Sequence, residues 1–142
     1  MKIYLSSDHA GLDLKRFVID LLQETTHDVE DLGPFSEESV DYPDFADTLA
    51  AKMEVDPDAC GIIMCGTGIG ISIRANRYKF IRAALCHTPT DARLTRQHND
   101  ANVLALGSRT TGTEVIRDIV QTFLETDFEG GRHQRRVDKL GQ

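Results

Sequence analysis

The chain has 142 residues, of which 40% are hydrophobic and 27% are charged, with 11 glycines and no tryptophan. This length predicts one domain, and this composition excludes disordered, collagen-like and disulfide-scaffold proteins. Lys and Arg number 16 against 23 Asp and Glu, which gives a net charge of -7 and argues against a nucleic-acid partner.

Five short apolar runs are typical of β-strands, and the third, Ile62-Ile63-Met64, is apolar without alternation, as buried parallel strands are. The predicted strands cover residues 3–6, 27–31, 61–65, 82–86 and 102–106. Helical spacing of apolar residues covers 12–22, 45–53 and 115–124, and Thr88-Pro89 predicts the start of a helix running toward His98. This alternation predicts the α/β class: a three-layer α/β/α sandwich around a five-stranded, Rossmann-like parallel sheet.

The charges are divided unevenly along the chain. Residues 1–73 hold 4 bases and 15 acids, whereas residues 74–142 hold 12 bases and 8 acids. This asymmetry fits an anionic ligand or a self-complementary assembly, and equally fits scattered solvated charge.

The cysteines and the apolar runs bear on location. Three cysteines without a CxxC pair indicate free thiols in a reducing compartment. No signal peptide begins the chain, and no apolar run approaches the roughly 18 residues of a membrane span. We therefore expect a cytoplasmic protein without a membrane partner.

Open parallel sheets bind ligands beyond the carboxyl ends of their strands, so the loops at that edge are candidate sites. Asp8 and His9 follow the first strand, where they can orient a hydroxylated substrate or exchange protons with it. Asp8 can equally serve only as the N-cap of the next helix.

A glycine loop, Cys65-Gly66-Thr67-Gly68-Ile69-Gly70, follows the most buried strand. Its glycines let backbone N–H groups point at an anion, and a helix N-terminus behind them adds positive potential. Ile71 excludes a dinucleotide fingerprint and a C-x5-R phosphatase loop, and no GK[ST] follows as in a P-loop. The Cys65 thiol is then either a base or an inert buried group, and Cys60 and Cys86, which lack such a loop, are predicted to be inert.

His98 and Asn99 end the predicted fourth helix. A histidine there can pass protons while the amide holds an oxygen, although His98 can equally be a helix C-cap. Arg109 follows the fifth strand, and Arg132 and Arg136 lie four apart in the basic tail. That spacing suits a phosphate, and exposed pairing with acids is the alternative.

The remaining basic side chains suggest no further site. His133, Arg135 and Lys139 fall off the face shared by Arg132 and Arg136, and we expect them to be solvated. The five histidines are scattered without HxxxH or CxxC spacing, which argues against a metal.

Five separated motifs occur in order along almost the whole chain. They are Ser7-Asp8-His9-Ala10-Gly11, Asp41-Tyr42-Pro43, Cys65-Gly66-Thr67-Gly68-Ile69-Gly70, Arg96-Gln97-His98-Asn99-Asp100 and Gly130-Gly131-Arg132-His133-Gln134-Arg135-Arg136. Together they resemble the type B ribose-5-phosphate isomerase family. That family also includes allose-6-phosphate isomerase and the subunits of galactose-6-phosphate isomerase.

The resemblance implies interconversion of D-ribose 5-phosphate and D-ribulose 5-phosphate through a cis-enediolate, with no metal and no cofactor. It implies that Cys65 is the proton-transferring base, because Ile71 stands where some relatives carry a glutamate for this task. It also implies that His98 opens the furanose ring with Asp8 nearby, and that Thr67 belongs to the catalytic set. The backbone N–H groups that hold the enediolate oxygens would be those of Gly66, Thr67, Gly68, Ile69 and Gly70.

The resemblance assigns the rest of the substrate as well. Asn99 matches a ligand of a sugar hydroxyl, and the groups around the phosphate are matched by His9, Arg109, Arg132 and Arg136. Family members are dimers or tetramers with sites built from two subunits. We therefore expect a homodimer or homotetramer in which the tail, residues 130–142, completes a site at the subunit interface.

Two alternatives to ribose 5-phosphate isomerisation stay open. One keeps the chemistry and changes the substrate to a 6-phosphohexose such as allose or galactose 6-phosphate. The other is a phosphosugar-binding module without turnover. All three require a phosphorylated sugar as the partner.

Overall fold

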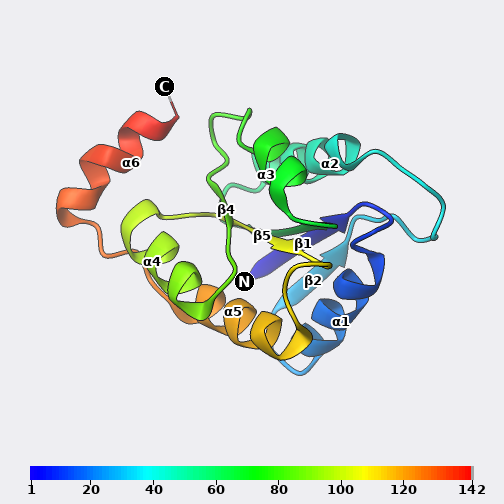
Figure 1. Cartoon of the computed structure of the whole chain (residues 1–142). Coiled ribbons are helices and arrows are strands. Elements are labelled where there is room, and N and C mark those ends of the chain that lie inside the picture. Colours follow the sequence, from blue (N-terminus) through cyan, green and yellow to red (C-terminus); the bar gives the residue numbers. More distant parts are fainter. Residues whose placement is uncertain (142) are drawn as a thin grey trace.

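The structure is a computed structural model that describes residues 1–141. Its centre is a sheet of five parallel strands, in the order β2-β1-β3-β5-β4 (Figure 1). The strands are β1 (Lys2–Ser7), β2 (Asp28–Asp31), β3 (Cys60–Cys65), β4 (Ala83–Leu85) and β5 (Val103–Gly107). All five predicted strands are confirmed, and with them the α/β class.

The helices pack on both faces of this sheet. They are α1 (Leu12–Gln23), α2 (Tyr42–Val55), α3 (Ile69–Ala75), α4 (Pro89–Asn99), α5 (Thr113–Glu125), the 3-10 turn η1 (Gly131–His133) and α6 (Gln134–Leu140). Helices α2 and α3 cover one face, α1 and α5 cover the other, and α4 lies beside α5 (Figure 1). The predicted three layers are confirmed, and the basic tail adds η1 and α6 outside them.

The core lies on both sides of β3, whose six residues are all buried. Successive side chains of a strand point to opposite faces. Ile62 and Met64 accordingly pack in the layer of α1 and α5, while Ile63 and Cys65 pack in the layer of α2 and α3. A strand covered on both faces needs an apolar run without alternation, as this sequence has.

Helix α4 begins at the Thr88-Pro89 pair, as predicted. The Asp91 backbone N–H donates to Thr88 Oγ1, and the Thr88 backbone N–H donates to Asp91 Oδ2, both at 3.1 Å. This capping box satisfies N–H groups that the first helical turn leaves without partners. The His87 N–H also donates to this carboxylate. Together with the Thr88 bonds, it holds the pKa of the Asp91 carboxyl below its usual value.

Lys15 is fully buried, which no periodicity of the sequence predicts. Its ammonium donates to Asp31 Oδ1 at 2.6 Å and to the Pro34 carbonyl at 2.7 Å. Burial lowers the pKa of Lys15, and the hydrogen bond to Asp31 opposes that shift. Lys15 thus ties α1 to the loop that leads from β2 toward α2.

The two outer strands of the sheet are short. Strand β2 has the sequence Asp-Val-Glu-Asp, and β4 has three residues. On β1, Lys2 Nζ lies 3.2 Å from Asp28 Oδ2 and 3.0 Å from Glu30 Oε2. With Lys52 Nζ 2.7 Å from Glu30 Oε1 and Lys15 Nζ 2.6 Å from Asp31 Oδ1, each carboxylate of β2 has a lysine partner.

Candidate active site

A cavity of about 450 Å³ opens at the carboxyl ends of β1 and β3, the edge at which the sequence predicts a ligand. The predicted residues that line it come from three separate loops. They are Asp8, His9, Cys65, Gly66, Thr67, Ile69, Gly70 and Arg109. The fold therefore brings the loops after β1, β3 and β5 to one place.

The glycine loop holds the Cys65 thiol at the floor of this cavity. The Gly68 backbone N–H donates to Cys65 Sγ at 3.1 Å. Gly68 has a φ of +75°, and a Cβ on it would lie 2.8 Å from the Leu106 carbonyl carbon, so this position requires glycine. The backbone N–H groups of Ser108 and Arg109 donate to the carbonyls of Cys65 and Gly66, both at 2.9 Å. These bonds clamp the loop to the end of β5.

The Arg109 side chain lies over the glycine loop. A Cβ on Gly66 would stand 2.9 Å from Arg109 Nη1, so the guanidinium occupies the space that the missing side chain leaves. Arg109 is exposed and lines the cavity. A guanidinium placed there can bind an anionic group of a ligand.

Asp8 is not the N-cap of α1, one of the two roles that the sequence leaves open for it, because Gly11 holds that position. Asp8 Oδ1 accepts a hydrogen bond of 3.0 Å from the Gly11 N–H, directly before α1, and the Asp8 side chain also lines the cavity. His9 is fixed differently, because its Nδ1 accepts a hydrogen bond of 3.1 Å from the Val40 N–H. A neutral His9 ring that accepts at Nδ1 carries its proton on Nε2, which makes Nε2 a hydrogen-bond donor.

Tyr42 also lines the cavity, although sequence reasoning gave it no role. Its ring lies against Gly70, where an added Cβ would stand 2.5 Å from Tyr42 Cζ. Tyr42 is 40% exposed at the first position of α2. The signal that could have found it is the Asp41-Tyr42-Pro43 motif.

His98 and Asn99 lie away from the cavity. Cys65 pairs with Gly107 at the carboxyl ends of β3 and β5, whereas His98 is in the last turn of α4, which leads into the amino end of β5 (Figure 1). Within one chain, His98 therefore lies at the edge of the sheet opposite to Cys65. Topology alone separates the two predicted proton-transfer groups.

The tail arginines lie with His98 rather than with Cys65. Helix α6 lies outside the three layers (Figure 1), and its end returns to the loop before β4, where a Cβ on Gly141 would stand 2.8 Å from the Lys79 carbonyl oxygen. Arg132 and Arg136 are exposed, and Arg136 Nη1 lies 3.5 Å from the Arg132 carbonyl. Neither guanidinium lies within 4.0 Å of a carboxylate of residues 1–141. Pairing of these arginines with acids, the alternative to a phosphate site, is thus not seen among residues 1–141.

The expectation that His133 is solvated is wrong. His133 is 8% exposed, because its ring stacks on His98 with the ring centroids 4.6 Å apart. Arg135 and Lys139 are exposed, as expected. The error arose because spacing places a residue on a helix face but does not show where the tail folds back on the chain.

His98, Glu129 and His133 are close enough to suggest a metal, since their candidate ligand atoms lie within 4.8 Å of one another. The two imidazole rings, however, are only 17° from parallel. Ring nitrogens direct their lone pairs in the ring plane, so two stacked rings do not converge on one ion. The cluster fits a stacked pair better than a metal centre.

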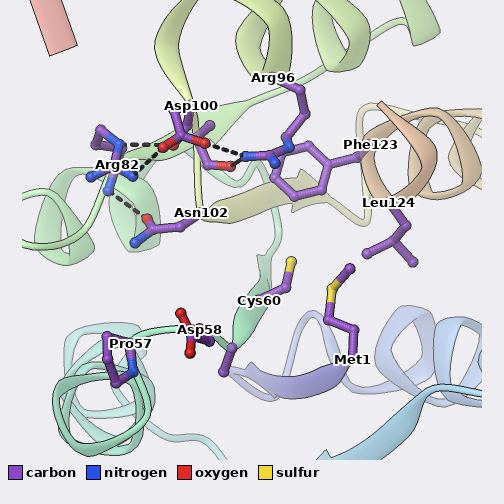
Figure 2. A pocket seen from close by; sticks show the side chains of 12 residues that line it. Met1, Pro57, Asp58, Cys60, Arg82, Arg96, Asp100, Asn102, Phe123 and Leu124 are labelled. Carbon is purple, nitrogen blue, oxygen red and sulfur yellow. Dashed lines mark hydrogen bonds and ion pairs between the residues drawn. The ribbon is translucent and has the colours of Figure 1, made fainter. Parts of the chain in front are cut away.

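A second cavity, of about 260 Å³, lies at the amino ends of the strands (Figure 2). Arg82 and Arg96 both bind the Asp100 carboxylate there, at 3.1 and 3.0 Å, and Asp100 has a φ of +46°. Burial raises the pKa of the Cys60 thiol beside them to about 12. Arg82, Arg96 and Asp100 are engaged with each other, and burial favours the neutral thiol of Cys60, so we assign this cavity no catalytic role.

Comparison with known proteins agrees with the fold and the motifs. Residues 3–140 match the ribose/galactose isomerase family. Ribose-5-phosphate isomerase B of Escherichia coli is 45% identical over 139 residues, which are 98% of this chain and 93% of that protein. A solved ribose-5-phosphate isomerase B of Clostridium thermocellum superposes with a TM-score of 0.96 at 49% identity, covering 99% of this chain and 95% of its own.

A third similar protein was solved with a bound sugar phosphate. It is the ribose-5-phosphate isomerase B of Mycoplasma genitalium, which holds ribulose 5-phosphate, and its TM-score is 0.94 at 45% identity. The match covers 98% of this chain and 93% of that one. The fold and the loops around Cys65 thus define a sugar-phosphate isomerase of the α/β class. This chain belongs to the ribose/galactose isomerase family.

Proposed function

We propose that this protein interconverts D-ribose 5-phosphate and D-ribulose 5-phosphate. The observation that carries the proposal is the Cys65 thiol, held by the Gly68 N–H at the floor of a cavity that also contains Asp8, His9 and Arg109. Membership of the ribose/galactose isomerase family supports the reaction class, and the ribulose 5-phosphate bound to the Mycoplasma genitalium protein supports the substrate.

The reaction moves one proton between C1 and C2 of the sugar. Cys65 as thiolate takes the proton from C2 of the open-chain aldose, and the electron pair passes to O1 to form a cis-enediolate. The same sulfur returns the proton to C1, while O2 gives up its hydroxyl proton to become the carbonyl oxygen and O1 gains a proton, so the net proton count is unchanged. The backbone N–H groups of the glycine loop stabilise the enediolate oxygens, on the order of 3 kcal/mol for each well-placed donor.

The other predicted residues prepare the substrate for this step. His98, with Asp8 nearby, opens the furanose ring, and Asn99 binds a sugar hydroxyl. The phosphate is bound by His9, Arg109, Arg132 and Arg136. Binding energy from the phosphate positions C1 and C2 over Cys65, so these residues act on turnover as well as on affinity.

We further propose that each active site is shared between two copies of the chain. His98, Asn99 and the tail arginines lie away from the Cys65 cavity of their own chain. A second copy that presents its α4 and its tail, residues 130–142, to this cavity completes the site. The assembly is then at least a homodimer, with a homotetramer as two such dimers.

The first test is an isomerase assay on the purified protein with ribose 5-phosphate, allose 6-phosphate and galactose 6-phosphate, with and without a chelator. We expect turnover of ribose 5-phosphate that survives the chelator. Cys65→Ala abolishes this turnover and leaves sugar-phosphate binding intact, whereas Cys60→Ala is the matched control and stays active. Full activity in Cys65→Ala would disprove the role of the thiol.

The second test concerns the shared site. Chains carrying Cys65→Ala and His98→Asn are co-expressed with different tags, and the mixed dimer is isolated by two affinity steps. One of its two sites is intact if the site is shared, so about half of the wild-type activity returns. Mixed dimers as inactive as the two parent variants would show that each site lies within one chain.

One alternative keeps this chemistry on a 6-phosphohexose, and the same assay decides it by the preferred sugar. A phosphosugar-binding module is the other, and binding without turnover of all three sugars would favour it. We also propose a cytoplasmic location. Its support is the presence of three buried, unpaired thiols, which persist in a reducing compartment.

A further inference from the structure

The His98 ring is held by one neighbour. It is partly exposed in the last turn of α4, and its nitrogens make no hydrogen bond and no ion pair within residues 1–141. The His133 ring lies face to face with it, with centroids 4.6 Å apart and planes 17° from parallel. A flat ring packed against an imidazole limits its rotation about the Cβ–Cγ bond.

His133 is in turn held by contacts with the residues before it. It is 8% exposed, and its Nε2 lies 3.4 Å from Glu129 Oε2. The intervening Gly130 and Gly131 have φ values of +63° and +55°, a left-handed turn that brings Glu129 and His133 side by side. The His133 backbone N–H closes this turn by donating to the Gly130 carbonyl at 3.0 Å.

The segment that carries this pair is bonded to the same turn of α4. Arg96 Nε donates to the Thr126 carbonyl at 3.2 Å, and the Glu129 N–H donates to the Gln97 carbonyl at 3.1 Å. The stacking contact of His98 follows directly after these two bonds in the chain. Arg96, Gln97 and His98 of α4 thus each contact one residue of the segment 126–133.

We propose that Glu129 and His133 are positioning residues for His98, and that their pair orients the imidazole for opening the sugar ring. The inference rests on the ring-opening role of His98 in the proposed function. The Glu129 carboxylate lies beside His133 Nε2, His133 stacks on His98, and His98 presents its own nitrogens to the sugar. Glu129 and His133 need not touch the substrate themselves.

Ring opening is a step that depends on such orientation. The bond between C1 and the ring oxygen O4 breaks, the O1 hydroxyl loses its proton as C1 becomes an aldehyde, and O4 gains a proton. A single imidazole that exchanges both protons must lie within about 3 Å of them. A freely rotating ring meets this condition only part of the time.

The test compares two substrates. Ribose 5-phosphate is mostly a closed furanose, whereas 4-deoxyribose 5-phosphate lacks the hydroxyl that closes the ring and needs no opening. We expect His133→Ala to lower kcat on ribose 5-phosphate by about 10-fold to 100-fold, the range seen for losing a partner that orients a metal-bound imidazole. On 4-deoxyribose 5-phosphate the rate stays within about 2-fold of wild type.

Conservative variants separate the two contacts. Glu129→Gln keeps the shape of the side chain and removes its charge, and we expect a smaller loss on ribose 5-phosphate only. His133→Phe retains a flat ring for the stack, so it recovers most of the rate lost in His133→Ala. The matched control is Glu125→Gln, an acid on α5 whose carboxylate bonds to Gln121 and not to the stacked pair.

The outcomes divide cleanly. An equal loss on both substrates in His133→Ala, or no loss on either, overturns the positioning role. His98→Asn identifies which proposal has failed, because it should lose activity on ribose 5-phosphate alone. If His98→Asn shows that selectivity and His133→Ala does not, only the positioning role fails. If wild-type protein turns over neither sugar, the proposed function fails.

Discussion

The Val40 backbone N–H donates to His9 Nδ1 at 3.1 Å, which leaves Nε2 as the protonated nitrogen of the neutral ring. We expect ¹⁵N spectra of histidine-labelled protein at neutral pH to show His9 with its proton on Nε2. Val40→Pro removes the donor and should weaken ribose 5-phosphate binding by roughly 10-fold, the effect of losing one hydrogen bond. Val40→Ala keeps the N–H and is the control. A proton on Nδ1 in the wild-type spectrum would contradict this interpretation.

Because of its buried thiols, the protein should become less stable as the pH rises into the alkaline range. Burial raises the pKa of both Cys60 and Cys86 to about 12 in the folded protein, whereas an unfolded thiol ionises near about 8.5. At a pH between these two pKa values, the folded protein keeps the thiol protons that the unfolded chain loses. The free energy of unfolding therefore falls as the pH rises. The fall is up to about 1.4 kcal/mol per pH unit for each thiol.

Denaturant unfolding of wild type and Cys60→Ala at pH 8, 9.5 and 10.5 measures this effect. The variant removes one of the two thiols, so it should lack about half of the pH dependence that they cause. Lysines and tyrosines titrate in both proteins, so the difference between them isolates one thiol. We expect the gap in stability to shrink or reverse as pH rises. Parallel pH profiles would show that Cys60 ionises at its ordinary value in the folded state.

Lys15 should be among the most sensitive charged positions. Lys15→Met keeps the length of the side chain but leaves the Pro34 carbonyl and part of Asp31 without a partner. We expect a loss of about 2 to 4 kcal/mol in the free energy of unfolding. Lys2→Met removes two partly exposed ion pairs and should cost below about 1 kcal/mol. Similar losses in the two variants would mean that Lys15 is not an anchor.

The glycine loop should tolerate no side chain at Gly68. Gly68→Ala places a Cβ against the Leu106 backbone at a φ of +75°, and we expect it to lower stability by about 2 kcal/mol or more and to reduce turnover. Gly112, which precedes α5, has no atom within 4 Å of an added Cβ, so Gly112→Ala is the control. Thermal unfolding and the isomerase assay together test this, and a stable, active Gly68→Ala protein would refute it.

The tail arginines should separate binding from stability. Arg136 makes no ion pair within residues 1–141, so Arg136→Ala should leave the free energy of unfolding within about 0.5 kcal/mol. Losing a charge-assisted hydrogen bond to phosphate should weaken binding of ribose 5-phosphate by roughly 10-fold to 100-fold. Arg135→Ala, its exposed neighbour, is the control for calorimetric titration. Equal weakening in both would point to general electrostatic attraction rather than a defined contact.

Local patterns were sufficient for most of the fold. Strand β3 was predictable because a run such as Ile62-Ile63-Met64 suits a strand covered on both faces, and α4 because Thr88-Pro89 is a helix start. Lys15 was not predictable, because a lysine in a helix is normally solvated and its partners come from a different loop. Burial of a charge depends on tertiary contacts that no periodicity encodes.

For the candidate site, the sequence predicts residue types but not their arrangement. The loops that hold Asp8 and Cys65 follow parallel strands, so their meeting at one edge follows from topology. The position of His98 at the opposite edge follows from the same topology, since the end of α4 leads into the start of β5. His133 was misjudged because a left-handed turn at two glycines reverses the tail onto α4.

The outer strands bear on how copies of this chain can associate. Strand β2 carries Asp28, Glu30 and Asp31 along its four residues, and β4 offers only three residues for pairing. Both outer strands are short, β2 is lined with charged side chains, and neither offers a long, apolar edge for pairing with another chain. Sheet extension from chain to chain is therefore disfavoured at both ends. An assembly of copies would therefore use the helical faces and the tail rather than a continuous sheet.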